Sequence, residues 1–154
     1  MLRGLYRDNS DHAVTGTTNE TDMASTSVVG STIGTTGTLH FIAAGTASGT
    51  SGTKILKLYM GSTNLGQSTV SSTAGQWRLE GWIYNTSATA QRTSIIAIEA
   101  SSGGGSQAFM TSNLYTSAAV DTSVSQTFKL TCTLGNSGDT CTQKIFDVFV
   151  VQIT

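Results

Sequence analysis

Hydrophobic and polar residues alternate with a period of two along most of the chain. Between residues 76 and 84, Trp77, Leu79, Gly81 and Ile83 occupy every second position, and Arg78, Glu80 and Trp82 stand between them. The same spacing recurs between residues 39 and 47. A period of two is the pattern of a β-strand that buries one face, since successive side chains point to opposite sides of a sheet.

Eight to nine strands are expected on this basis, separated by turns rich in Gly, Ser, Thr and Asn. No apolar stripe at helical spacing persists for three turns, so no helix is predicted. Regularly spaced short strands are typical of a β-sandwich or barrel, and the predicted fold class is all-β with antiparallel strands. The clearest strands are Thr21–Val29, Leu39–Ala47, Lys54–Met60, Gln76–Tyr84, Arg92–Ala100, Gln107–Tyr115, Ser125–Leu134 and Lys144–Ile153.

The first residues differ from the rest of the chain, which predicts a short N-terminal arm over residues 1–12 and one β-domain over residues 13–154. In the arm, apolar and basic side chains interleave before the Thr- and Ser-rich body begins. An arm of this kind either packs on a neighbouring molecule or is a solvated tail. The residues expected to make its contacts are Leu2, Arg3, Leu5, Tyr6 and Arg7.

The last predicted strand is apolar on both faces, which is unusual for a strand of a sandwich that shows one face to water. Phe146, Val148 and Val150 point one way, and the alternate positions are also largely apolar. Trp82 and Tyr84 share the outward face of an earlier strand. These five residues are therefore candidates for a subunit interface, the alternative being burial in the centre of the sandwich.

Composition narrows the possible functions. The chain has 27 Thr, 20 Ser and 17 Gly, but 38% of its residues are hydrophobic and its net charge is −1, which argues against disorder. Eight Lys and Arg against nine Asp and Glu exclude a binder that neutralises nucleic-acid phosphates. No apolar run is long enough to cross a membrane, and no secretory signal is expected at the start of the chain.

Catalytic and metal-binding chemistry finds little support. His12 and His40 stand in no metal-ligand spacing, and no nucleotide or cofactor motif is present, so neither a metal nor a cofactor is expected. Glu80 and Glu99 lie on neighbouring predicted strands, as a glycoside hydrolase would require. An ion pair between Glu80 and Arg78 is the simpler explanation, and no catalytic residue is assigned.

The two cysteines are a candidate disulfide. Cys132 and Cys141 flank a turn at Gly135–Gly138, and a four-residue hairpin loop there would set the two residues directly opposite each other. The alternative is a pair of buried thiols that act as small hydrophobic side chains.

Four segments give the chain a resemblance to the jelly-roll structural proteins of tailed bacteriophages. They are a Thr-rich stretch with acidic residues at 18–25, GTTGTLHFIAAG at 34–45, KILKLYMGSTNL at 54–65 and GQWRLEGWIY at 75–84. The resemblance extends over residues 15–154. It implies a single jelly-roll sandwich similar to the tumour-necrosis-factor-like type, which commonly assembles as a trimer.

The resemblance also implies a role in the virion. A single jelly roll with a short arm suits a capsid decoration or cement protein, made in the host cytoplasm and held on the outer capsid surface. Its expected partners are two copies of itself and the major capsid protein, which the arm would contact; no nucleic acid or membrane is expected. The alternative is a receptor- or glycan-binding tip of a head or tail fibre, with Trp82 and Tyr84 beside Arg78 contacting a host-surface glycan.

Overall fold

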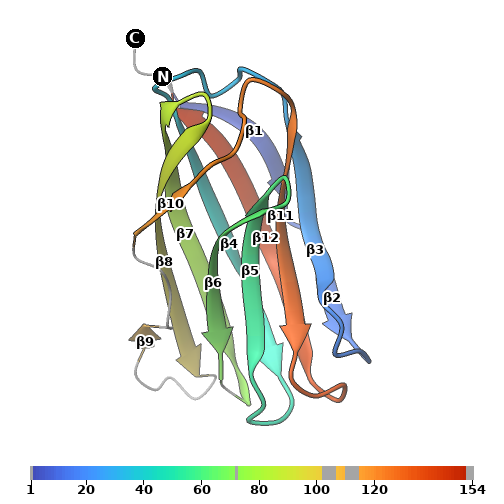
Figure 1. The fold of residues 1–154 in the computed structure, drawn as a ribbon. Coiled ribbons are helices and arrows are strands. Elements are labelled where there is room, and N and C mark those ends of the chain that lie inside the picture. Colours follow the sequence, from blue (N-terminus) through green and yellow to red (C-terminus); the bar gives the residue numbers. More distant parts are fainter. Residues whose placement is uncertain (1, 72, 102–106, 110–114, 152–154) are drawn as a thin grey trace.

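The computed structural model describes residues 2–71, 73–101, 107–109 and 115–151, and the described chain folds into two antiparallel β-sheets that face each other (Figure 1). Within this part there is no helix long and apolar enough to cross a membrane. The strands are β1 (Leu2–Asp8), β2 (His12–Thr15), β3 (Thr21–Val28), β4 (Thr38–Ser48), β5 (Lys54–Met60), β6 (Thr63–Val70), β7 (Ala74–Ser87), β8 (Ala90–Ser101), β9 (Gln107–Phe109), β10 (Thr116–Ala118), β11 (Gln126–Leu134) and β12 (Thr140–Val151).

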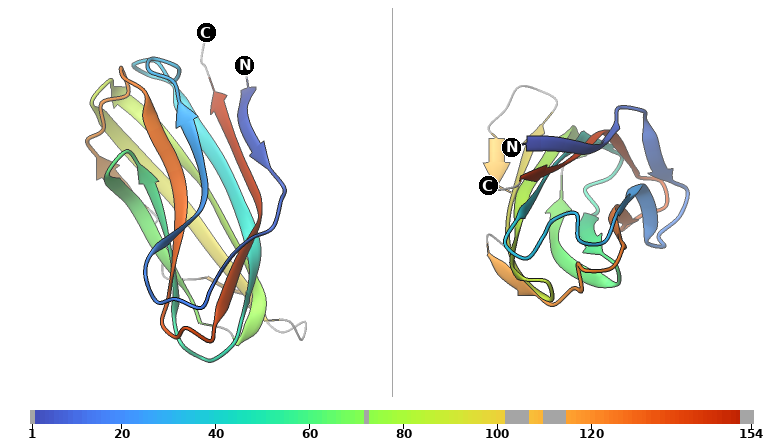
Figure 2. Two further views of the ribbon diagram at one scale, coloured as in Figure 1. Left: turned by 90° about the vertical axis from the view of Figure 1, so that its right-hand side faces the viewer. Right: turned by 90° about the horizontal axis from the view of Figure 1, so that it is seen from above.

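The larger sheet has the order β1-β12-β4-β7-β8-β10, with β2 pairing along β12 and β9 along β8. The smaller sheet has the order β3-β11-β5-β6. The chain passes from one sheet to the other between β2 and β3, β3 and β4, β4 and β5, β6 and β7, β10 and β11, and β11 and β12 (Figure 2). The predicted all-β sandwich of antiparallel strands is therefore confirmed.

The core lies between the two sheets and is built from the positions that the period-two pattern places inward. Phe41 and Phe146 of the large sheet both contact Phe128 of the small sheet, at centroid distances of 5.6 and 5.9 Å. Aromatic rings at these separations add to the stabilisation that comes from their buried area. The inward residues of β7, Trp77, Leu79 and Ile83, are all buried, as predicted.

The short strands differ from the expectations. β1, β2, β6 and β10 were not expected as strands, because their polar and small residues give no alternating apolar signal. β6 runs through Thr63–Val70 and closes one edge of the small sheet, where only Leu65 and Val70 are large buried apolar side chains. Of the predicted strand at Gln107–Tyr115, the described residues are those of β9 and Tyr115, and Tyr115 is not in a strand.

The predicted hairpin around Gly135–Gly138 is wrong. β11 pairs with β3 and β5 in the small sheet, whereas β12 pairs with β1, β2 and β4 in the large sheet. The turn therefore connects the two sheets, and Cys132 and Cys141 are not cross-strand partners. The sequence could not distinguish these arrangements, because a short turn serves a hairpin and a crossing between sheets equally well.

Candidate interaction face on the large sheet

The outer face of the small sheet is polar, as expected for a face in contact with water. Lys57 donates a hydrogen bond to Glu20 at 2.8 Å, and Lys129 donates one to Asp22 at the same distance. The ammonium group of Lys129 also lies 5.7 Å from the ring centre of Tyr59. These charged side chains are half-buried or exposed, and each already has an oppositely charged partner.

The outer face of the large sheet is different, because aromatic rings cross it from strand to strand. The register places Phe149 of β12 beside His40 of β4, and His40 beside Trp82 of β7. Tyr84 follows two residues later on the same face of β7. We call Phe149, His40, Trp82 and Tyr84 the aromatic row.

The rings of the aromatic row lie nearly parallel to one another. Those of His40 and Trp82 are stacked with centroids 4.0 Å apart and planes 22° apart. Phe149 stacks on the other side of His40 at 5.9 Å, and Tyr84 lies 6.4 Å from Trp82 with planes 20° apart. The rings of His40 and Trp82 therefore cover each other on one side, which leaves less of the Trp82 ring free for stacking on a sugar.

The acidic groups on this face are matched by basic ones. Glu80 contacts His40 Nε2 through Oε1 at 3.1 Å and accepts a hydrogen bond from Arg78 Nη2 through Oε2 at 2.7 Å. The hydrogen bond from Arg78 is the main cause that lowers the pKa of the Glu80 carboxyl, and burial opposes it. Asp147 of β12 accepts a hydrogen bond from Arg7 at 3.2 Å. The expected ion pair between Arg78 and Glu80 is thus confirmed.

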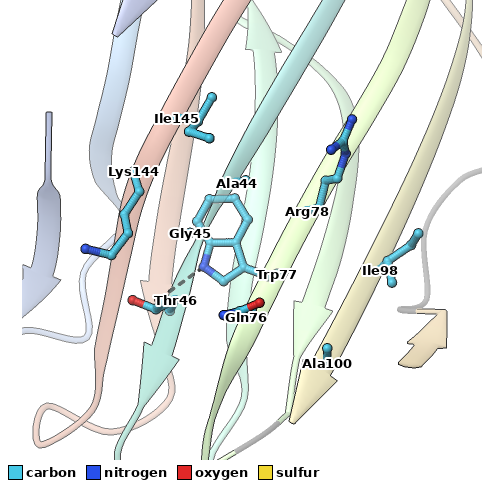
Figure 3. A pocket seen from close by; sticks show the side chains of 10 residues that line it. All are labelled: Ala44, Gly45, Thr46, Gln76, Trp77, Arg78, Ile98, Ala100, Lys144 and Ile145. Atoms are coloured by element: carbon cyan, nitrogen blue, oxygen red, sulfur yellow. Dashed lines mark hydrogen bonds between the residues drawn. The ribbon is translucent and has the colours of Figure 1, made fainter. Parts of the chain in front are cut away.

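Next to the aromatic row, the face is hollowed where small residues meet (Figure 3). The hollow holds about 370 Å³, and Ile98 and Ile145 project at its sides. It lies over Gly45 of β4, where an added Cβ would collide with the carbonyl oxygen of Thr142 and approach the Trp77 ring to 2.5 Å. Trp77 in turn donates a hydrogen bond from Nε1 to the carbonyl of Thr46 at 3.1 Å. The glycine therefore leaves room for the buried Trp77 ring on the inner side of the sheet.

The residues proposed for a subunit interface fall on two sides of the large sheet. Trp82 and Tyr84 lie on its outer face, in the aromatic row. Phe146, Val148 and Val150 point into the core and are at most 1% exposed, so they are covered within a single chain. Their apolar character on β12 is explained by the core, and the apolar side chains on the other face of that strand are Ile145, Phe149 and Val151.

The residues proposed as a capsid-binding arm form an edge strand of the chain's own sheet. β1 pairs with β12, and a bulge between Gly4 and Tyr6 interrupts the register. Leu5 and Tyr6 pack against the core, and the Tyr6 ring meets Phe146 edge-on at 6.1 Å. Three of the five proposed arm side chains, Leu2, Arg3 and Arg7, are exposed.

Both cysteines are free thiols buried between the sheets. The pKa of the Cys141 thiol is raised mainly by a hydrogen bond with Cys132, and burial of the thiol raises it further. The two thiols are therefore neighbours across the core, one from each sheet. The candidate disulfide remains a prediction, now as a link between sheets.

The carboxylates considered for hydrolysis do not face each other. Glu80 lies on the outer face, whereas Glu99 is 9% exposed and accepts a hydrogen bond from the backbone N–H of Ser71 at 3.2 Å. Each of the two histidines contacts a carboxylate: His12 contacts Asp8 at 2.9 Å, and His40 contacts Glu80. Among the described residues, no group of three or more potential metal ligands comes together.

A buried ion pair was missed by sequence reasoning. Lys54 and Asp139 are both fully buried, with Nζ 3.4 Å from Oδ2. The ammonium group also donates to the carbonyl oxygens of Thr50 and Gly52. The sequence contained an indication of this burial, because Lys54 is an even number of residues away from the inward residues Leu56 and Leu58 and therefore lies on the same face of β5. The pair ties the loop before β5 to the loop before β12.

The chain was compared with known proteins: no family model and no curated protein matches it.

Proposed function

We propose that this protein is a non-enzymatic structural protein of a tailed-phage virion that assembles as a homotrimer and decorates the outer surface of the capsid. Its partners are two further copies of the same chain and the major capsid protein. The self-association surface is the outer face of the large sheet. The observation that carries the proposal is the contrast between this face and the outer face of the small sheet.

Apolar side chains are exposed to solvent on the outer face of the large sheet, whereas the outer face of the small sheet carries ion pairs. Tyr84, Ile96 and Ile145 are 43%, 47% and 42% exposed on the same face. Apolar patches of this kind on soluble proteins mark interaction sites. The mixed and locally balanced charges beside them favour a partner with the same kind of surface, which a second copy provides.

The size of the face agrees with a stable interface. Five strands at about 4.8 Å spacing and nine residues at about 3.3 Å give a projected area of about 700 Å². Stable interfaces of standard size bury about 600–1,000 Å² per partner, and the projected area lies within that range. The outer face of the large sheet is thus large enough to hold subunits together.

The order of the strands supports the finer description of the fold. We base the jelly-roll description on the two packed antiparallel sheets, which contain β12-β4-β7 and β3-β11-β5-β6, and on the connections that cross between them. Trimeric assembly is what the resemblance to the tumour-necrosis-factor-like jelly roll implies. The exposed side chains of β1, Leu2, Arg3 and Arg7, are the ones we propose for contact with the capsid.

Two isoleucines allow a matched test of the surface. Ile96 lies on the outer face of the large sheet, and Ile55 lies half-buried on the outer face of the small sheet. We expect Ile96→Asp to convert the oligomer to monomers, since a carboxylate would be buried there on assembly. Ile55→Asp should leave the oligomer intact. The measurement is mass by light scattering at several concentrations, with circular dichroism to check folding.

Capsid binding is tested by mixing each protein with phage heads that lack it and measuring the bound fraction after sedimentation. We expect saturable binding for the natural chain and for Ile55→Asp, and weaker binding for Ile96→Asp because the avidity of three linked sites is lost. An assembled protein that does not bind heads would contradict the decoration role. An Ile96→Asp variant that stays assembled would contradict the proposed surface.

A further inference from the structure

His40 occupies the middle of the proposed self-association face. Its ring lies between those of Trp82 and Phe149, and the residue is 9% exposed. Its Nε2 atom lies 3.1 Å from Glu80 Oε1. Since the neighbour is a carboxylate that also binds Arg78, the neutral imidazole serves as the hydrogen-bond donor at Nε2.

At neutral pH the charged groups nearest this ring form ion pairs. On β7, Glu80 is matched by Arg78, and on β12 and β1, Asp147 is matched by Arg7. Tyr84 and the exposed Arg92, which stand opposite each other on β7 and β8, are the next titratable or charged groups along the face. A proton on His40 would therefore add a positive charge where the existing acidic groups already have basic partners.

We propose that His40 makes self-association of this protein pH-dependent, so that its protonation separates the subunits. The inference rests on the proposed function, because it requires that the outer face of the large sheet is the contact between copies. Histidine is the side chain that titrates between about pH 5 and pH 8 without special perturbation.

Symmetry makes the charge costly. In a cyclic trimer every copy carries the same histidine, so protonation adds three positive charges to the assembly, one from each copy. Assembly also removes the water that would otherwise screen these charges and solvate the second N–H of the imidazolium. In the separated chain, the ring edge and Glu80, whose side chain is 37% exposed, keep access to water. Protonation is therefore favoured more in the free chain than in the assembly, and acid shifts the equilibrium towards separation.

The chain contains a natural control, because its other histidine lies elsewhere. His12 is exposed on β2 and contacts Asp8 at the edge of the sheet. The experiment measures the association constant by sedimentation equilibrium at pH 7.5 and pH 5.0 for the natural chain, His12→Gln, His40→Gln and His40→Phe. The last variant keeps a ring in the stack and cannot take up a proton.

For the natural chain and for His12→Gln, we expect association at pH 5.0 to be weaker by about tenfold or more, the size typical of a coupling between two linked equilibria. For His40→Phe, and for His40→Gln if it folds, we expect the same association constant at both pH values. An assembly that is equally stable at both pH values, or a His40→Phe variant that still dissociates in acid, would overturn the inference while leaving the proposed function intact. A natural chain that is monomeric at both pH values would overturn both.

Discussion

Tyr6 provides the most direct test of how the first residues are held. The resemblance and the interleaved apolar and basic residues suggest an arm that reaches away from the domain. In the structure, Tyr6 instead packs against the core beside Phe146 and donates a hydrogen bond to Asp8 at 3.3 Å. The substitution Tyr6→Ala removes both contacts without touching the outer face of the large sheet.

The expected cost follows from the burial of the ring. Replacing a fully buried aromatic residue by alanine destabilises a protein by about 3–5 kcal/mol. Tyr6 is half-buried, so about half of that applies, or about 2 kcal/mol, which already includes its edge-on contact with one aromatic ring. For a chain of this length, a loss of about 2 kcal/mol lowers the midpoint of thermal unfolding by about 4–8 °C.

The assay is urea unfolding followed by circular dichroism, at two protein concentrations so that effects of association are separated from those of folding. Arg3→Ala is the matched control, since Arg3 is exposed on the same strand and should change stability by less than about 0.5 kcal/mol. Equal unfolding midpoints for Tyr6→Ala and the natural chain would show that residues 2–8 are not part of the folded unit.

Three further predictions concern the body of the domain. Gly45→Ala should destabilise the fold by about 2–3 kcal/mol in a thermal melt because its Cβ has no room, whereas Gly4→Ala, with nothing within 4 Å of the added atom, should have little effect. The pKa of the Glu20 carboxyl is lowered mainly by the hydrogen bond from Lys57. The stability that this carboxylate contributes is therefore present above its unfolded pKa and is lost as the pH falls through the lower folded value. Urea unfolding should show that Glu20→Gln loses less stability between pH 6 and pH 3 than the natural chain does. Cys132 and Cys141 should react with a thiol reagent only on unfolding, and intact mass after exposure to an oxidant such as dioxygen should be 2 Da lower if they form the disulfide.

The long strands of the fold could be predicted from the sequence because each carries its own alternating signal. β5 was predicted with its observed bounds, Lys54–Met60, and the inward face of β7 was predicted correctly. In these strands one face is buried in the core, so local sequence and tertiary structure demand the same pattern.

The edge strands and the pairing could not be predicted in this way. β1 and β6 have few large buried residues, and their stability comes from neighbours distant in sequence. The turn after β11 gives no indication that the chain changes sheets there. The same limit applies to the outer face: Trp82 and Tyr84 were predicted to point outward, but their alignment with His40 and Phe149 depends on the register of three strands.

The two-sided apolar pattern of β12 was interpreted as an interface strand, and the candidate residues were taken from one face of it. The structure assigns those residues to the core and leaves Phe149 on the open face. Alternation separates the two faces of a strand but does not say which one is inside. That choice requires the opposite sheet, where Phe128 meets Phe146.

The central claim, that the outer face of the large sheet holds three copies of this protein together, is tested most directly by the mass of the natural chain in solution. Multi-angle light scattering at neutral pH and micromolar concentration should give three times 16.0 kDa. A mass of 16.0 kDa at every concentration would contradict the account, because the aromatic row and the exposed isoleucines would then face water in the native protein.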